Sequence, residues 1–151
     1  MPVDGSQASM EAVALACSLG KRNKGIVYVV YVIEVARSLP LDAELDVESQ
    51  RGEEILARAE TVALDEDFRV EGELLQARDA GHAVVDEAIE RGVEAVIMGI
   101  EVAEETAGFE WPQRGKPKPL ALEMDLGRVA QYVLQNAPCE VWLIRRSIGE
   151  R

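Results

Sequence analysis

Residues 26–33 read Ile-Val-Tyr-Val-Val-Tyr-Val-Ile, and every one of them is β-branched or aromatic. Such a run favours a strand that packs against neighbours on both of its faces, and we expect it to be central in a sheet. A second run, residues 93–99, is apolar except for Glu94 and ends at Gly99, and it also reads as a buried strand. Two buried parallel strands therefore constrain the fold more than any other feature.

Helical spacing of apolar residues marks four further segments: 7–19, 48–64, 82–91 and 125–137. We expect Ser6 to cap the first of these helices. Additional strands are predicted at Val3, as the remnant of a first strand, at 69–77, as a half-exposed edge strand, and at 140–144. Regular alternation of strands and helices predicts an α/β fold, a Rossmann-like single domain over residues 1–151 with helices on both faces of a parallel sheet.

Residues 100–124 interrupt this rhythm as a long inserted loop. A loop of this length in a compact domain is usually functional or disordered. It contains Trp111, and its charged side chains are Glu101, Glu104, Glu105, Glu110, Arg114, Lys116, Lys118 and Glu123.

A formal net charge of -12 argues against binding to nucleic acid or to an anionic membrane surface. No apolar run reaches the roughly 20 residues that span a bilayer, and a cytoplasmic protein is expected. Cys17 and Cys139 are far apart and are expected to be small core residues. The single histidine, His82, has no ligand-spaced partner and is expected on the surface, so no metal site is predicted.

Five short motifs, in order along nearly the whole chain, resemble those of the universal stress protein family. They are Pro2-Val3-Asp4-Gly5-Ser6, Tyr31-Val32-Ile33, Ile97-Met98-Gly99, Gly127-Arg128-Val129-Ala130 and Asn136-Ala137-Pro138-Cys139-Glu140-Val141. The resemblance implies a five-stranded parallel sheet in the order 3-2-1-4-5. It also implies a cytoplasmic homodimer formed through the last strand, around Val141 and Leu143.

Many members of this family bind ATP through a G-x-x-G-x9-G-[ST] pattern, from which this chain departs. Val102 stands at the second glycine, Arg128 at the serine, and Gly99 and Gly127 are 28 positions apart instead of 13. The resemblance therefore implies an altered adenine-nucleotide site for ATP, with magnesium accompanying it. Its expected binding residues are Asp4, Val32, Met98, Gly99, Gly127, Arg128 and Val129.

Three functions remain open from the sequence. The first is a dimeric binding or regulatory module with little or no turnover. The second is a nucleotide-hydrolysing or nucleotide-sensing enzyme on the same fold, motivated by Asp4, Val32, Gly127 and the basic residues from Arg114 to Lys118. The third is a structural dimer that recruits a protein partner through its inserted loop. No nucleophile elbow, P-loop, CxxC or HExxH motif is present.

Overall fold

The computed structural model describes residues 1–101 and 127–145. In chain order the elements are α1 (Gln7–Asn23), β1 (Tyr28–Glu34), α2 (Asp46–Asp65), β2 (Glu71–Ala77), α3 (Ala80–Arg91), β3 (Ala95–Ile100), α4 (Gly127–Asn136) and β4 (Glu140–Arg145). The predicted strands and helices are confirmed to within a few residues at their described ends, except the first strand at Val3, where the structure has only an isolated bridge between Pro2 and Val30. The predicted inserted loop, with Trp111 and its basic residues, lies almost entirely outside the described residues, as does Asp125 at the predicted start of the last helix.

Local chemistry explains where α1 and α3 begin and where α3 ends. Ser6 caps α1, since its side chain accepts a hydrogen bond from the Ser9 amide at 3.1 Å, as predicted. Asp79 caps α3 in the same way, accepting from the His82 amide at 3.0 Å. Gly92 ends α3 in the left-handed conformation, with φ of 59°.

Hydrogen bonding joins the strands in two parallel pairs, β1 with β2 and β3 with β4. The amino-terminal segment adds a parallel bridge between Pro2 and Val30, on the edge of β1 opposite β2. β1 thus has a neighbour on each edge, β2 on one and the Pro2 bridge on the other, while its predicted central place in a larger sheet stays a prediction. β2 lies at an edge among the described strands. The predicted five-strand order is not confirmed, because no strand ladder joins the two pairs.

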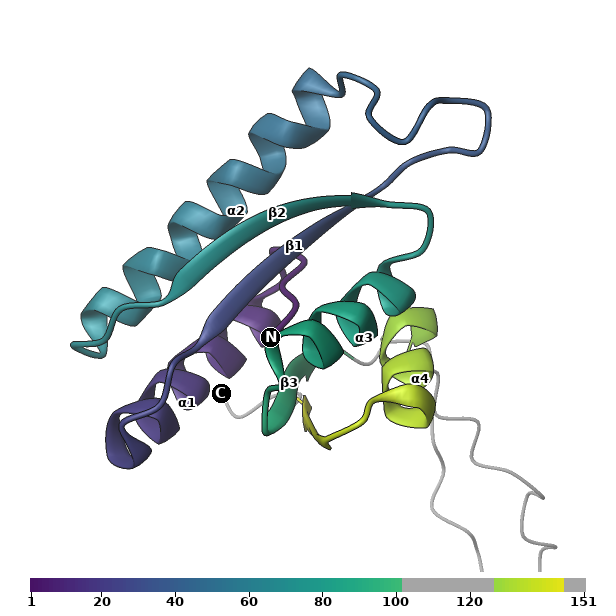
Figure 1. The fold of residues 1–151 in the computed structure, drawn as a ribbon. Coiled ribbons are helices and arrows are strands. Elements are labelled where there is room, and N and C mark those ends of the chain that lie inside the picture. The colour runs from purple at the N-terminus through teal and green to yellow at the C-terminus, as the bar shows by residue number, and fades with distance from the viewer. Residues whose placement is uncertain (102–126, 146–151) are drawn as a thin grey trace, which may run out of the picture.

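Helices cover both sides of the strands (Figure 1), and each side has its own core. On one side α1 and α2 pack residues such as Val13, Cys17 and Ile55 against Val29. On the other side α3 and α4 pack against alternate residues of β3. The buried residues of this second core are Val84, Val85 and Ala88 of α3, Val96, Met98 and Ile100 of β3, and Ala130 and Val133 of α4. Cys17 is buried, and Cys139 packs at the margin of the second core.

No helix in the described part of the chain is both long and apolar enough to cross a membrane.

Candidate functional site

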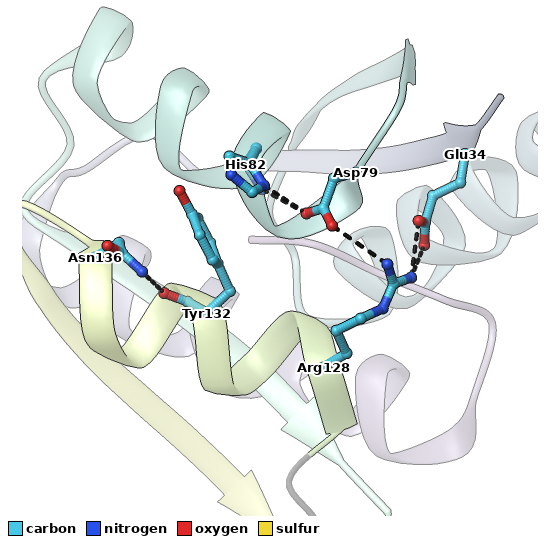
Figure 2. Close-up of polar contacts among 6 residues, drawn as sticks. All are labelled: Glu34, Asp79, His82, Arg128, Tyr132 and Asn136. Carbon is cyan, nitrogen blue, oxygen red and sulfur yellow. Dashed lines mark hydrogen bonds and ion pairs between the residues drawn. The ribbon is translucent and has the colours of Figure 1, made fainter. Parts of the chain in front are cut away.

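Polar groups from three elements meet at the carboxyl end of β1 (Figure 2). Arg128, in the first turn of α4, donates two hydrogen bonds to the Glu34 carboxylate at 2.7 and 2.8 Å. Glu34 is the last residue of β1. The same guanidinium also donates to Asp79 Oδ2 at 3.2 Å, so the β1 end, the α3 cap and the start of α4 form one ion-pair network.

The network continues from Asp79 to His82 and Tyr132. His82 Nδ1 lies 2.9 Å from Asp79 Oδ1, and the His82 ring stacks on Tyr132 with centroids 4.0 Å apart. The His82 side chain is 59% exposed, so it lies on the surface as expected, although it has ordered partners there. Gly81 allows α3 and α4 to approach closely at Tyr132. Any larger residue would place its Cβ only 3.0 Å from the Tyr132 Cβ.

Hydrogen bonds stabilise the charged forms of this network. The His82 side chain and amide, both bonded to Asp79, hold the pKa of that carboxyl below its ordinary value, and Arg128 adds to the effect. Hydrogen bonding to Glu34 raises the pKa of the Arg128 guanidinium. The Asp79 carboxylate and the Arg128 guanidinium are therefore both ionised near neutral pH.

Carboxylates also lie at the amino terminus of α1. Asp4 Oδ1 accepts from the Ser6 amide at 2.9 Å, which fixes the turn into the helix. Glu101, just beyond β3, accepts from the Ala8 amide at 3.3 Å. Because a helix amino terminus attracts anions, Glu101 lies where an external anion could otherwise bind.

Beside this turn, an open cavity of about 480 Å³ separates the Asp4–Ser6 segment from α2. Arg51 and Arg58 of α2 line it, together with Glu54 and Ile55. Arg58 Nη1 donates to the Gly5 carbonyl at 3.2 Å. Sequence analysis did not identify these two arginines, which lie within the segment 48–64 that it predicted as a helix.

Gly99 has a structural reason that the sequence did not show. A Cβ at this position would lie 2.1 Å from the Ala8 carbonyl oxygen and 2.6 Å from the Ser9 nitrogen. The end of β3 therefore packs directly on the backbone of α1. This close approach accounts for the glycine without a ligand.

The remaining predicted site residues fall into two groups. Val32, Met98 and Val129 belong to the second core or its margin, and Met98 is buried. Gly127 begins α4 with a positive φ of 73°, next to the exposed Arg128. The structure thus joins Arg128 to Glu34 and places the three apolar residues in one core, while Asp4 engages the α1 turn.

Within residues 1–101 and 127–145, no group of three histidine, cysteine or acidic side chains is arranged to hold a metal ion.

Parallel strands covered on both sides by helices, with polar side chains collected at their carboxyl ends, define a Rossmann-like α/β protein. The family model of the universal stress protein family matches residues 1–145. The chain belongs to the universal stress protein family.

Individual relatives agree with this assignment. The chain is 28% identical over 152 residues to universal stress protein MJ0531 of Methanocaldococcus jannaschii, covering 97% of this chain and 80% of the relative. Its fold is similar to the universal stress protein of Archaeoglobus fulgidus in complex with dAMP, with a TM-score of 0.69, 20% identity and coverage of 95% and 93% of the two chains. It is also similar to a universal stress protein in complex with cAMP, with a TM-score of 0.64, 16% identity and coverage of 97% and 94%.

Proposed function

We propose that this protein is a nucleotide-binding module that takes an adenine nucleotide at the carboxyl ends of β1 and β3. The observation that carries the proposal is the meeting of Arg128, Glu34 and Asp79 at this edge. Open parallel sheets bind ligands beyond the carboxyl ends of their strands. Family membership and the relatives in complex with dAMP and cAMP support adenine as the base.

Arg128 is the proposed phosphate ligand. A guanidinium has five N–H donors, and the carboxylates of Glu34 and Asp79 accept three hydrogen bonds from it. Counting only its hydrogen bonds to described residues, the Arg128 guanidinium therefore keeps N–H donors for a phosphate oxygen. The two carboxylates hold this planar group in place. Asp4, Val32, Met98, Gly99, Gly127 and Val129 complete the proposed site as residues that shape or border it.

The neighbouring carboxylates favour a ligand of low charge. Glu34, Asp79 and Glu101 all lie at this edge, and repulsion increases with each phosphate that a nucleotide carries. We therefore propose a nucleoside monophosphate as the preferred ligand. ATP, accompanied by magnesium, would bind more weakly.

The test is native mass spectrometry of the purified protein with AMP, using uridine monophosphate as the matched control. The proposal expects an AMP adduct that survives a tenfold excess of the uridine nucleotide. Equal adducts with both nucleotides would mean that the base is not recognised, and no adduct would contradict the site itself.

Binding without turnover is the proposed activity. The Asp4 carboxylate, in the turn before α1, accepts a hydrogen bond from the Ser6 backbone amide, which is a structural role. The alternative of a nucleotide-hydrolysing enzyme predicts phosphate release from ATP that is lost in Asp4→Asn. Such a loss would overturn the proposal of a binding module.

A single domain over residues 1–151 and the five-strand order 3-2-1-4-5 are also part of the proposal. This order counts the segment at Val3 as strand 1, so it corresponds to β2, β1, the Val3 segment, β3 and β4. The bridge between Pro2 and Val30 supports this order, since it adds the first segment on the edge of β1 away from β2.

The proposed homodimer uses the edge of β4 that is not paired with β3. Trp142 is 40% exposed on this strand, whereas Val141 and Leu143 pack against the second core. The side chains of Val141 and Leu143 are therefore poor candidates for the interface, and the β4 backbone and Trp142 are better ones.

A further inference from the structure

Exposed apolar side chains concentrate in the segment that joins β1 to α2. The described residues contain nine exposed large apolar side chains, and three of them fall within residues 39–47. These are Leu39, Leu41 and Val47, which are 41%, 48% and 77% exposed. Figure 1 shows the segment projecting beyond the end of β2. Single exposed apolar residues are common on protein surfaces, whereas several gathered in one segment mark a candidate interaction site.

Side chains from the end of β2 and the residue after it hold this segment in its exposed position. Gln76 Nε2 donates hydrogen bonds to the Leu41 carbonyl at 3.2 Å and to the Ala43 carbonyl at 2.9 Å. Arg78 Nη1 donates to the Ala36 carbonyl, at the start of the segment. The backbone is therefore fixed at its base and at its middle. A surface that is ordered before binding loses less conformational entropy when a partner covers it.

The segment also forms turns of its own. The Leu39 amide donates to the Ala36 carbonyl at 3.0 Å, and the Ala43 amide donates to the Pro40 carbonyl at 3.1 Å. The ring of Pro40 restricts the backbone between these two turns. The segment thus satisfies its backbone groups locally while leaving its aliphatic side chains in solvent.

The charged side chains of the segment are all negative. Between Arg37 and Arg51 the chain has no lysine or arginine and has four acids: Asp42, Glu44, Asp46 and Glu48. All four are exposed, and none forms an ion pair with another residue in the described part of the chain. Such a surface repels nucleic acid and anionic membranes. It is complementary to a positively charged partner that also carries apolar side chains.

We propose that residues 38–48 form a docking surface for a basic amphipathic helix of another protein. The apolar face of that helix covers Leu39, Leu41 and Val47, and its lysine or arginine side chains pair with the four carboxylates. An apolar centre with a charged rim is the usual composition of a protein interface. The inference does not depend on nucleotide binding.

The experiment measures the affinity of the full chain for a fluorescent peptide of about 14 residues, with leucine and lysine at helical spacing, by anisotropy. The test variant carries serine at the three aliphatic positions: Leu39→Ser, Leu41→Ser and Val47→Ser. The matched control carries serine at three exposed apolar positions on helices: Leu15→Ser, Leu64→Ser and Ile89→Ser. We expect peptide binding to weaken at least about tenfold in the test variant and by less than about twofold in the control.

A second pair of variants separates local from general attraction. The formal net charge of -12 attracts any basic peptide. One variant neutralises the segment: Asp42→Asn, Glu44→Gln, Asp46→Asn and Glu48→Gln. The other removes four exposed acids elsewhere: Glu53→Gln, Glu60→Gln, Asp86→Asn and Glu90→Gln. The net charge is the same in both, so a loss of affinity at least about fivefold larger in the first variant is expected from a local surface.

Equal peptide affinity in the two serine variants would overturn the proposal, and so would equal losses in the two neutralised variants. Hydrogen exchange at residues 38–48 should slow when the peptide binds, and protection confined to other residues would contradict this docking surface. A sedimentation coefficient that falls in the serine test variant without peptide would make a second copy of the chain the occupant, contrary to the proposal. The test variant should keep the AMP affinity of the unchanged chain, so failure of the proposed function is a separate result.

Discussion

The Arg128 guanidinium and the Glu34 carboxylate form a two-point ion pair, with N–O distances of 2.7 and 2.8 Å. These residues are 94 positions apart and belong to the beginning of α4 and the end of β1. The pair connects the α3–α4 side of the protein to the carboxyl end of β1. It also holds a cation at the edge where we propose that the nucleotide binds.

Arg128→Ala is expected to leave stability nearly unchanged and to weaken AMP binding. The side chain is 66% exposed, so loss of its ion pairs should lower the free energy of unfolding by less than about 1 kcal/mol. Loss of a charge-assisted bond to phosphate should weaken AMP binding by about tenfold or more. Arg22→Ala, on the exposed last turn of α1, is the matched control. Equal AMP affinity in both variants would remove Arg128 from the site.

Glu34→Gln should act in the opposite direction. It removes the negative charge that pairs with Arg128, so the guanidinium is more available and repulsion of a phosphate is smaller. We expect tighter binding of AMP, with a larger gain for ATP because ATP carries more charge. Titrations of both nucleotides at low and high salt would measure this. A loss of affinity would mean that Glu34 positions Arg128 and that this role outweighs its charge.

Gly99→Ala should destabilise the protein by about 1–3 kcal/mol, because the new methyl group meets the backbone of α1 at Ala8 and Ser9. Gly72→Ala is the control, since its nearest contact would be an ordinary 3.4 Å to Glu60 Oε1. Urea denaturation of both variants gives the comparison. Similar stability in the two would show that the end of β3 can move away from α1.

Stability should increase as pH rises from about 5 to about 8. The Met1 amino group has a pKa of about 5 in the folded protein and an ordinary value of 8.0. In this window the unfolded chain binds a proton that the folded chain does not, so the free energy of unfolding rises with pH. Acetylation of the amino group should reduce this slope. An identical slope with and without acetylation would show that the amino group does not titrate between pH 5 and 8.

Trp142→Glu should convert the proposed dimer into a monomer in sedimentation experiments. Trp142 is exposed on β4, whereas its neighbours Val141 and Leu143 pack against the second core. Leu64→Glu, at a 61% exposed position on α2, controls for added charge on an apolar surface residue. An unchanged sedimentation coefficient for a dimeric Trp142→Glu protein would place the interface elsewhere.

The sequence predicted the features of this fold that depend on local periodicity. The β-branched run at 26–33 indicated a strand, and the helical spacing in 7–19 and 82–91 indicated two of the helices that cover the strands. These predictions succeed because burial on one or both faces leaves a pattern in neighbouring residues.

The candidate site was less predictable because its contacts join distant residues. The sequence singled out Arg128 but could not show that Glu34 and Asp79 hold it, since those pairs span 94 and 49 positions. It also could not show that Gly99 is required by the α1 backbone, or that Arg51 and Arg58 border a cavity beside Asp4. Such roles arise from packing between elements.

Calorimetric titration of the purified 151-residue chain with AMP tests the proposed function most directly. Saturable binding is expected, with a Kd on the order of 10⁻⁵ M, which weakens in Arg128→Ala and not in Arg22→Ala. ATP, titrated with and without magnesium, should bind more weakly than AMP. The absence of saturable heat with AMP, cAMP and ATP at millimolar concentrations would contradict an adenine-nucleotide site on this protein.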